Sequence, residues 1–152
     1  MSKRMAMTVA IGLLMAGVGA RIAGDEKEDA VKMDMKLLQG DWVMQSFESN
    51  GKPISAEEAR KIKLTIKGDH YLVNIGERKI EMTFKIDPAK KPKAIDFTMA
   101  QGEEKAVTRG IYEISADTFK VCRAVEAGKD RPSDFSTKEG SGTALASYKR
   151  AK

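Results

Sequence analysis

The chain has 152 residues, of which 41% are hydrophobic and 32% are charged, and it contains one cysteine and one histidine. This length suits one domain built around one core. The single cysteine excludes an internal disulfide. The single histidine excludes a multi-histidine metal site and a histidine-centred triad within one chain. No cofactor is expected.

The first 24 residues have the pattern of a secretory signal peptide. Lys3 and Arg4 precede an uncharged apolar run over residues 5–20, which closes on the small residues Val18, Gly19 and Ala20. A membrane-spanning helix needs about 20 apolar residues, so the run favours a cleaved signal over a stable membrane anchor. We expect cleavage after Ala20 or Gly24 and export to the periplasm or the extracellular space.

The positive charge of the chain comes partly from this segment. The formal net charge is +5, from 27 basic and 22 acidic residues. Removing Lys3, Arg4 and Arg21 leaves 24 basic residues against 22 acidic ones, a net charge of +2. The remaining lysines alternate with apolar residues instead of forming a basic face, which argues against nucleic acid as a partner.

The rest of the chain divides into a short lead-in and one folded domain. Residues 25–34 are mostly charged and show no apolar periodicity, so we expect a flexible lead-in there. The domain is predicted over residues 35–152. A helix is predicted over residues 55–61, where Ser55 and Glu58 have the spacing of a capping box. This helix is expected to cover one end of the domain.

Short runs with an apolar and a polar face fill the domain from residue 40 onward. Turn residues separate them at intervals of about 8 to 12, which is typical of a sandwich or barrel. We predict eight strands, over residues 41–49, 62–67, 70–75, 79–86, 95–99, 107–114, 118–124 and 143–149. Short connections favour antiparallel neighbours, and closure of eight strands removes exposed edges. The predicted fold is an all-β, eight-stranded, antiparallel up-and-down barrel with one short helix.

Two sets of motifs carry a resemblance to known barrels. Gly40, Asp41 and Trp42 resemble the Gly-x-Trp signature of lipocalin-like barrels, in which an arginine of the last strand lies against the tryptophan. Arg150 is the candidate partner, and a guanidinium over an indole contributes roughly 0.5 to 2 kcal/mol. Trp42 itself is interpreted as core, with ligand stacking as the alternative.

The longer resemblance runs from Leu38 almost to the C-terminus. Its motifs are Leu38-Gln39-Gly40-Asp41-Trp42, Asn50-Gly51-Lys52-Pro53, Lys91-Pro92-Lys93-Ala94-Ile95-Asp96, Gly110-Ile111-Tyr112-Glu113, Val121-Cys122, Gly128-Lys129-Asp130-Arg131-Pro132, Phe135-Ser136 and Gly140-Ser141-Gly142. Together they resemble a family of small exported, lipocalin-like domains expanded in planctomycete bacteria, which has no assigned activity. The resemblance implies export and a barrel but no catalytic residues. Arg123 departs from it, because the family usually has an apolar residue there.

Arg123 is also singled out by the strand register. Pairing Ile114 with Phe119 aligns Tyr112 with Val121 and Glu113 with Lys120, whereas a slip of one residue loses both pairs. This register places Arg123 opposite Gly110, on the face of Tyr112. Arg123 then projects into the barrel, where a buried guanidinium needs an anionic partner. The alternative is that Arg123 sits at a fraying strand end and reaches solvent.

Three classes of function remain open. A small-molecule carrier predicts an adaptable apolar pocket. Its predicted residues are Arg123, Tyr112, Met44, Met82, Phe84, Phe97 and Met99. A protein- or polymer-interaction module predicts a filled barrel with its contact surface on the loop over residues 128–142. In this loop, Arg131, Pro132 and Phe135 form a predicted lid, with structural capping as the other interpretation.

An enzyme is the least favoured class. His70 follows a Gly-Asp turn and is interpreted as an exposed turn residue, and Cys122 as a half-buried small residue instead of a nucleophile. The acidic residues lack calcium-loop spacing, so no metal site is predicted. A carboxylate-based hydrolase is the residual alternative, without a nominated pair. The default oligomeric state is a monomer.

Overall fold

Antiparallel strands make up most of the folded chain. A computed structural model describes residues 23–152, and the predicted signal residues 1–22 lie outside it. The elements are α1 (Ala23–Leu38), β1 (Gly40–Ser49), β2 (Lys52–Pro53), α2 (Ala56–Arg60), β3 (Ile62–Lys67), β4 (His70–Ile75), β5 (Arg78–Asp87), β6 (Ala94–Gln101), β7 (Glu104–Ile114), β8 (Thr118–Ala124) and β9 (Thr143–Arg150). Each predicted strand is present, and β7 starts three residues earlier than expected.

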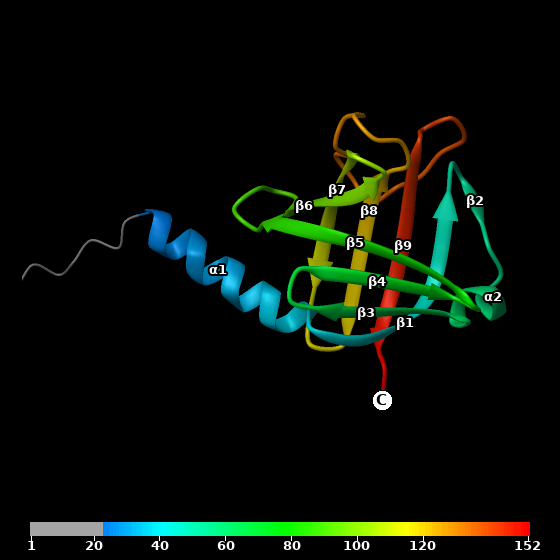
Figure 1. Ribbon diagram of the computed structural model, residues 1–152, viewed down its shortest axis with the longest axis horizontal. Helices are drawn as coiled ribbons and strands as arrows, with labels where there is room; N and C mark the ends of the chain where they lie inside the picture. The colour runs from blue at the N-terminus through cyan, green and yellow to red at the C-terminus, as the bar shows by residue number, and fades with distance from the viewer. Residues whose placement is uncertain (1–22) are drawn as a thin grey trace, which may run out of the picture.

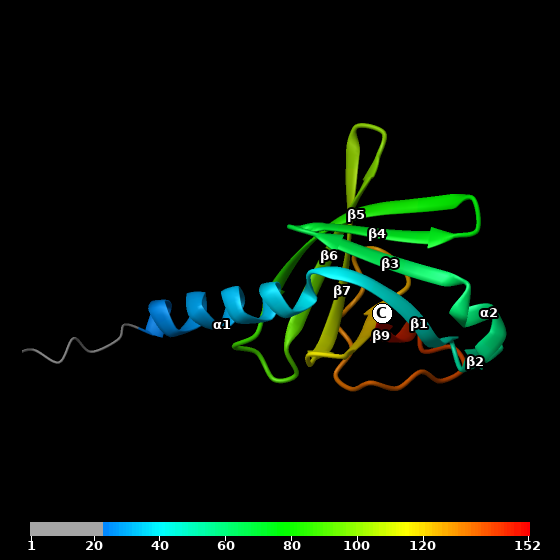
Figure 2. The ribbon, with the colours of Figure 1, turned by 90° about the horizontal axis from the view of Figure 1, so that it is seen from below.

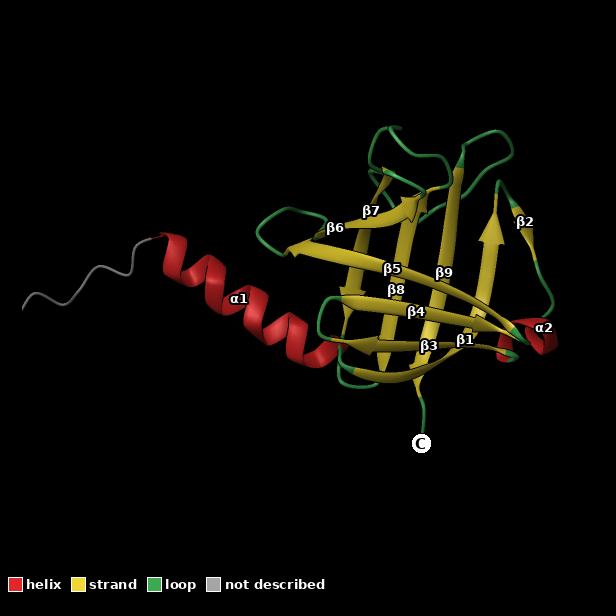
Figure 3. Cartoon of the chain, in the orientation of Figure 1, coloured by secondary structure: helices red, strands yellow, loops and turns green. Residues whose placement is uncertain are grey.

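Strand β1 closes the sheet on itself. Successive strands pair from β3 to β9, and β1 pairs with β3 on one side and with β9 on the other. All these pairings are antiparallel, which confirms the eight-stranded antiparallel barrel; β2 adds only two residues beside the end of β1. Strands β3 to β5 cross β7 to β9 steeply in projection (Figures 1 and 3). The side chains that point inward from both groups form the core.

A bulge in β1 changes which side chains point inward. Trp42 and Met44 are buried, but the register with β9 shifts between Met44 and Ser46. The extra residue reverses the alternation, so Phe47 instead of Ser46 packs against the core. After the bulge, β1 turns through Asn50 and Gly51, whose φ angles of 51° and 78° suit the Asn-Gly type of hairpin turn.

Strands β5 and β6 are paired over only part of their length. Their ladder runs from Asp87–Ala94 to Thr83–Thr98 and then stops. Beyond it, within the described chain, β5 continues beside β4 alone and β6 beside β7 alone. The two hairpins therefore point in different directions, as the view from below shows (Figure 2).

Helix α1 corrects the expectation of a flexible lead-in over residues 25–34. It is a 16-residue helix that extends away from the barrel (Figure 1). Its last turn is fixed to the barrel, because Leu38 is fully buried in the core and Asp34 contacts β7. Gly24, one of the two predicted cleavage sites, falls in its first turn. Neither described helix is both long and apolar enough to cross a bilayer.

Helix α2 forms where the capping signal predicts it. Ser55 is the N-cap and accepts a hydrogen bond from the Glu58 backbone N–H at 3.1 Å. On the inner side of the helix, Ala59 is fully buried and belongs to the core cluster. Figure 1 shows α2 at the end of the barrel opposite to α1.

Candidate ligand-binding cavity

One half of the barrel interior is filled by aromatic side chains. Phe119 stacks on Tyr148 with ring centroids 5.7 Å apart and lies 5.8 Å from Trp42. Tyr71 meets Phe97 edge to face at 4.9 Å. Such pairs contribute roughly 0.5–1.5 kcal/mol beyond the burial of their area. This half is a packed core without room for a ligand.

Arg150 seals this half from outside. Its guanidinium lies 4.2 Å from the centre of the Trp42 ring and donates hydrogen bonds to the carbonyls of Gln39 at 2.8 Å and Leu37 at 2.5 Å. Trp42 donates its indole N–H to the Leu38 carbonyl at 2.9 Å. The last strand, the first strand and the end of α1 are therefore held together at one point.

Tyr112 belongs to this closed half and not to a pocket beside Arg123. Its hydroxyl donates to the Asp34 carboxylate of α1 at 2.7 Å, and Lys93 binds the same carboxylate oxygen at 2.8 Å. Burial of the phenol and the hydrogen bond to Asp34 raise the pKa of Tyr112. The sequence interpretation of Tyr112 as a ligand contact is thus not supported by its position.

The other half of the interior is hollow. A cavity of about 360 Å³ extends from the floor formed by Tyr71 and Tyr148 to Ile75, which is 40% exposed at the rim. Its wall is mainly apolar and includes Met44, Phe47, Ile62, Val73, Met82 and Met99. Other hollows, including one of about 460 Å³ lined by Glu113, Lys120 and Lys149, lie on the outer face. The interior cavity is the one that a barrel builds to enclose a molecule.

Among the residues that the structure describes, Arg123 is the only charged one in the cavity lining. The register of β7 and β8 is the predicted one, with Arg123 opposite Gly110 and also paired with Ala144 of β9. The strand continues to the buried Ala124, so Arg123 does not stand at a fraying end. Among the described residues, no carboxylate forms an ion pair with it.

Gly110 makes room for this arginine. A Cβ atom at residue 110 would lie 2.8 Å from the Cys122 carbonyl oxygen and 3.0 Å from the Arg123 Cβ. Both distances are shorter than van der Waals contact allows, so any side chain would push β8 away. The glycine therefore permits the close approach that brings Arg123 into the wall.

Two neutral phenols lie at the cavity floor. Burial raises the pKa of Tyr71 well above its usual value, and the neighbouring Tyr148 adds to that rise. Burial also raises the pKa of Tyr148, and this rise exceeds the lowering that a hydrogen bond from Tyr71 causes. The positive charge of Arg123, which lines the same cavity, lowers both pKa values by a smaller amount. The floor is polar and uncharged.

The structure brings together four of the seven residues predicted to bind a ligand. Met44, Met82, Met99 and Arg123 line the cavity. Phe84 and Phe97 are inward-facing but fill the closed half of the core, with 3% and 1% exposure. Sequence reasoning missed Phe47, Tyr71 and Tyr148. For Phe47 the β1 bulge reverses the alternation, whereas Tyr71 and Tyr148 lie on predicted strands, and Tyr148 alternates with polar neighbours.

The loop over residues 125–142 does not form the predicted lid. Arg131 donates to the carbonyl of Gly110 at 2.8 Å and to the Asp96 carboxylate at 2.7 Å, which fixes the loop to the outside of β6 and β7. Phe135 lies under Lys120, whose Nζ is 4.5 Å from the ring centre. Of the described residues, none in this loop, Pro132 included, lines the cavity. Figure 2 shows the loop beside the outer face.

This loop buries Cys122 instead. The thiol faces outward beside the Ser136 carbonyl at 3.8 Å, and the residue is fully buried, more so than the half-buried position expected. Burial, with a contribution from Asp134, raises the pKa of Cys122 to about 11. A thiol of this kind is poorly nucleophilic at neutral pH.

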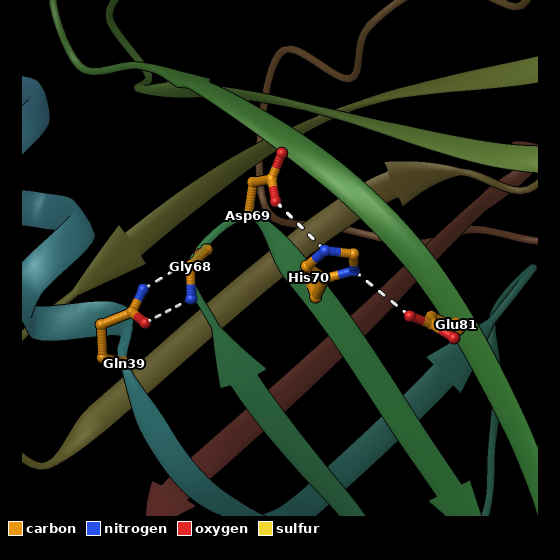
Figure 4. Close-up of polar contacts among 5 residues, drawn as sticks. All are labelled: Gln39, Gly68, Asp69, His70 and Glu81. Atoms are coloured by element: carbon orange, nitrogen blue, oxygen red, sulfur yellow. Dashed lines mark hydrogen bonds and ion pairs between the residues drawn. The ribbon is translucent and has the colours of Figure 1, made fainter.

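The single histidine lies on the outer surface. His70 Nδ1 is 3.2 Å from Glu81, and Nε2 is 3.6 Å from Asp69 (Figure 4). Next to it, the Gln39 side chain holds both backbone groups of Gly68, at 2.6 and 3.1 Å. This arrangement ties the β3–β4 turn to the start of β1. The described residues include no group of three or more His, Cys, Asp or Glu side chains arranged to hold a metal.

Comparison with known proteins adds no further assignment, because the chain matches no protein-family model, no curated protein and no solved structure.

Proposed function

We propose that this chain is an exported carrier that binds one small apolar or amphipathic molecule inside the barrel. The hollow half of the interior is the observation that carries the proposal, since its volume of about 360 Å³ falls within the range of ligand sites. Methionines in the wall supply an adaptable surface. The proposal also includes export and a relationship to the planctomycete family of exported domains that the sequence motifs resemble.

Binding is favoured over catalysis by the chemistry of the lining. Arg123 supplies a guanidinium, which only donates hydrogen bonds, and the two tyrosines hold their protons because their pKa values are raised. None of these groups is matched to proton transfer near neutral pH. The cavity is therefore suited to hold and orient a molecule.

The proposal is tested by filling the cavity. Ala146 lines it and is 6% exposed, so Ala146→Phe introduces a ring into the space that a ligand would use. Native mass spectrometry of wild-type protein purified under mild conditions should show an adduct that organic extraction removes. The Ala146→Phe protein should lack the adduct while keeping its circular-dichroism spectrum. The control is Ala127→Phe, at an exposed position of the outer loop.

An interaction module is the second candidate, favoured by the ordered loop on the outer face of β7 and β8. That function would use exposed residues of the 128–142 segment and would not depend on the cavity. A wild-type protein without any adduct, which also fails to bind decanol or decanoate after extraction, would contradict the carrier proposal and leave the interaction module.

A further inference from the structure

We infer that the ligand is a monocarboxylate with a short apolar tail, whose head group binds the Arg123 guanidinium. This inference rests on the proposed function and names the class of molecule that the cavity takes.

The first step concerns charge. Arg123 is half-buried, is the only charged residue in the wall and has no ion-pair partner among the described residues. Removing a guanidinium from water without compensation is costly. A neutral ligand in the cavity would add to that cost by displacing water around Arg123. A ligand with a negative group offsets the cost instead.

The second step concerns the kind of anion. One guanidinium supplies one positive charge in a planar fork, which matches the two oxygens of one carboxylate. A phosphate monoester carries close to two negative charges at neutral pH, and the described residues of the wall include no second cation to balance it. The tyrosine hydroxyls at the floor are neutral. A singly charged carboxylate therefore fits the lining, and a dianion does not.

The third step concerns the space beside Arg123. Ala144, the partner of Arg123 on the neighbouring strand β9, lines the cavity and has a small side chain. Arg123 is therefore flanked by a small residue on that side. This leaves room for a head group next to the guanidinium, whereas a larger flanking side chain would cover it.

The fourth step concerns length. A water molecule in the liquid has a share of about 30 Å³. On that scale the cavity volume of about 360 Å³ accommodates roughly a dozen non-hydrogen atoms. An unbranched acid of about ten carbons has this size, and the methionines and isoleucines of the wall would contact its tail.

The experiment compares four probes by isothermal titration calorimetry on the full mature chain after organic extraction and refolding. Decanoate is the expected ligand. Decanol keeps the tail without the charge, decyl phosphate adds a second charge, and hexadecanoate has more carbon atoms than the cavity volume accommodates. Decanoate should bind more tightly than each of the others, and at least about tenfold more tightly than decanol, since a hydrogen bond to a charged group contributes that much.

The matched variants are Arg123→Met and Arg109→Met. Both remove one positive charge, but Arg109 is exposed on the outer face of β7. Arg123→Met should weaken decanoate about tenfold or more and leave decanol within about threefold, whereas Arg109→Met should change neither. If Arg123→Met does not fold, Arg123→Lys replaces it, and its loss of the planar fork should still weaken decanoate.

The outcomes separate the two proposals. Decanol binding as tightly as decanoate, or unchanged decanoate affinity in Arg123→Met, overturns the carboxylate inference while the carrier survives. If decyl phosphate binds more tightly than decanoate, the inference of a singly charged head group is wrong. If hexadecanoate binds more tightly than decanoate, the inferred tail of about ten carbons is wrong. Failure of all four probes on wild-type protein, with no native adduct, rejects the carrier and this inference together.

Discussion

The two halves of the barrel interior are built from the same alternating strands but are packed differently. The closed half holds Trp42, Phe97 and Phe119, each almost fully buried, and is sealed by Arg150. The open half holds methionines, isoleucines and Arg123 around a hollow of about 360 Å³. A single strand contributes to both halves, since β8 places Phe119 in the closed half and Arg123 in the open half. Dense packing and open space are separated along the barrel axis.

Truncating one large side chain in each half should give the largest difference. Phe119→Ala should lower the free energy of unfolding by about 3–5 kcal/mol, because the ring is packed on all sides. Met99→Ala should cost less than about 2 kcal/mol, because Met99 is only partly buried and already faces an empty space. Urea unfolding of both variants measures this. Equal losses would mean that the hollow half is packed as densely as the closed one.

Alkaline pH should lower the free energy of unfolding, with contributions from both halves, since every tyrosine of the chain has a raised pKa in the folded state. Below the ordinary tyrosine pKa of about 10, folded and unfolded chains both hold the phenol protons. Above it the unfolded chain releases protons that the folded chain retains, so stability falls by about 1.4 kcal/mol per pH unit for each tyrosine.

Urea unfolding over a series of alkaline pH values tests this slope, with phenolate absorbance as the second readout. Tyr112→Phe should remove the contribution of the closed half, and Tyr148→Phe one of the two contributions of the cavity floor. Phenolate absorbance that develops near pH 10 in folded protein would contradict the burial of the three hydroxyls.

Enlarging a side chain should destabilise the closed half but not the open half. Leu64→Phe enlarges a fully buried residue of the closed half and should cost about 1–3 kcal/mol. Ala146→Leu extends into the cavity and should be neutral or stabilise by about 1 kcal/mol. Thermal unfolding of the two variants beside wild type gives the comparison. A large loss from Ala146→Leu would show that the cavity cannot accept additional atoms.

The smallest effect concerns the outer loop, which covers neither end of the cavity. Phe135→Ala removes the contact with Lys120 and should cost about 0.5–1 kcal/mol. It should accelerate reaction of the Cys122 thiol with a disulfide reagent several-fold and leave ligand retention unchanged. Asp130→Ala, at an exposed position of the same loop, is the control. A loss of ligand in Phe135→Ala would show that the loop acts on the cavity.

The strands and one hairpin register could be predicted because their signals are local. Alternation fixes which side chains share a face, and matching Tyr112 with Val121 and Glu113 with Lys120 selects one pairing. The Glu113–Lys120 ion pair forms at 3.4 Å. These inferences need only residues within a few positions of a turn.

The remaining features depend on residues far apart in the sequence. Helix α1 is polar and carries no strong local signal, and Asp34 is fixed by Lys93 and Tyr112, which lie 59 and 78 residues away. Alternation gives the face of a side chain but not its depth along the barrel. For that reason Phe84 and Phe97 could not be separated from Met82 and Met99, although only the methionines reach the cavity.

The early end of the ladder between β5 and β6 has a mechanical consequence. Past the Thr83–Thr98 pair, the β4–β5 and β6–β7 hairpins share no backbone hydrogen bonds in the described chain. Met82 and Met99, the first residues past that pair on each strand, both line the cavity. Spreading the two hairpins about this pair therefore breaks no hydrogen bond of the sheet. We therefore expect any widening of the cavity to take place on that side of the wall, where the sheet itself does not oppose it.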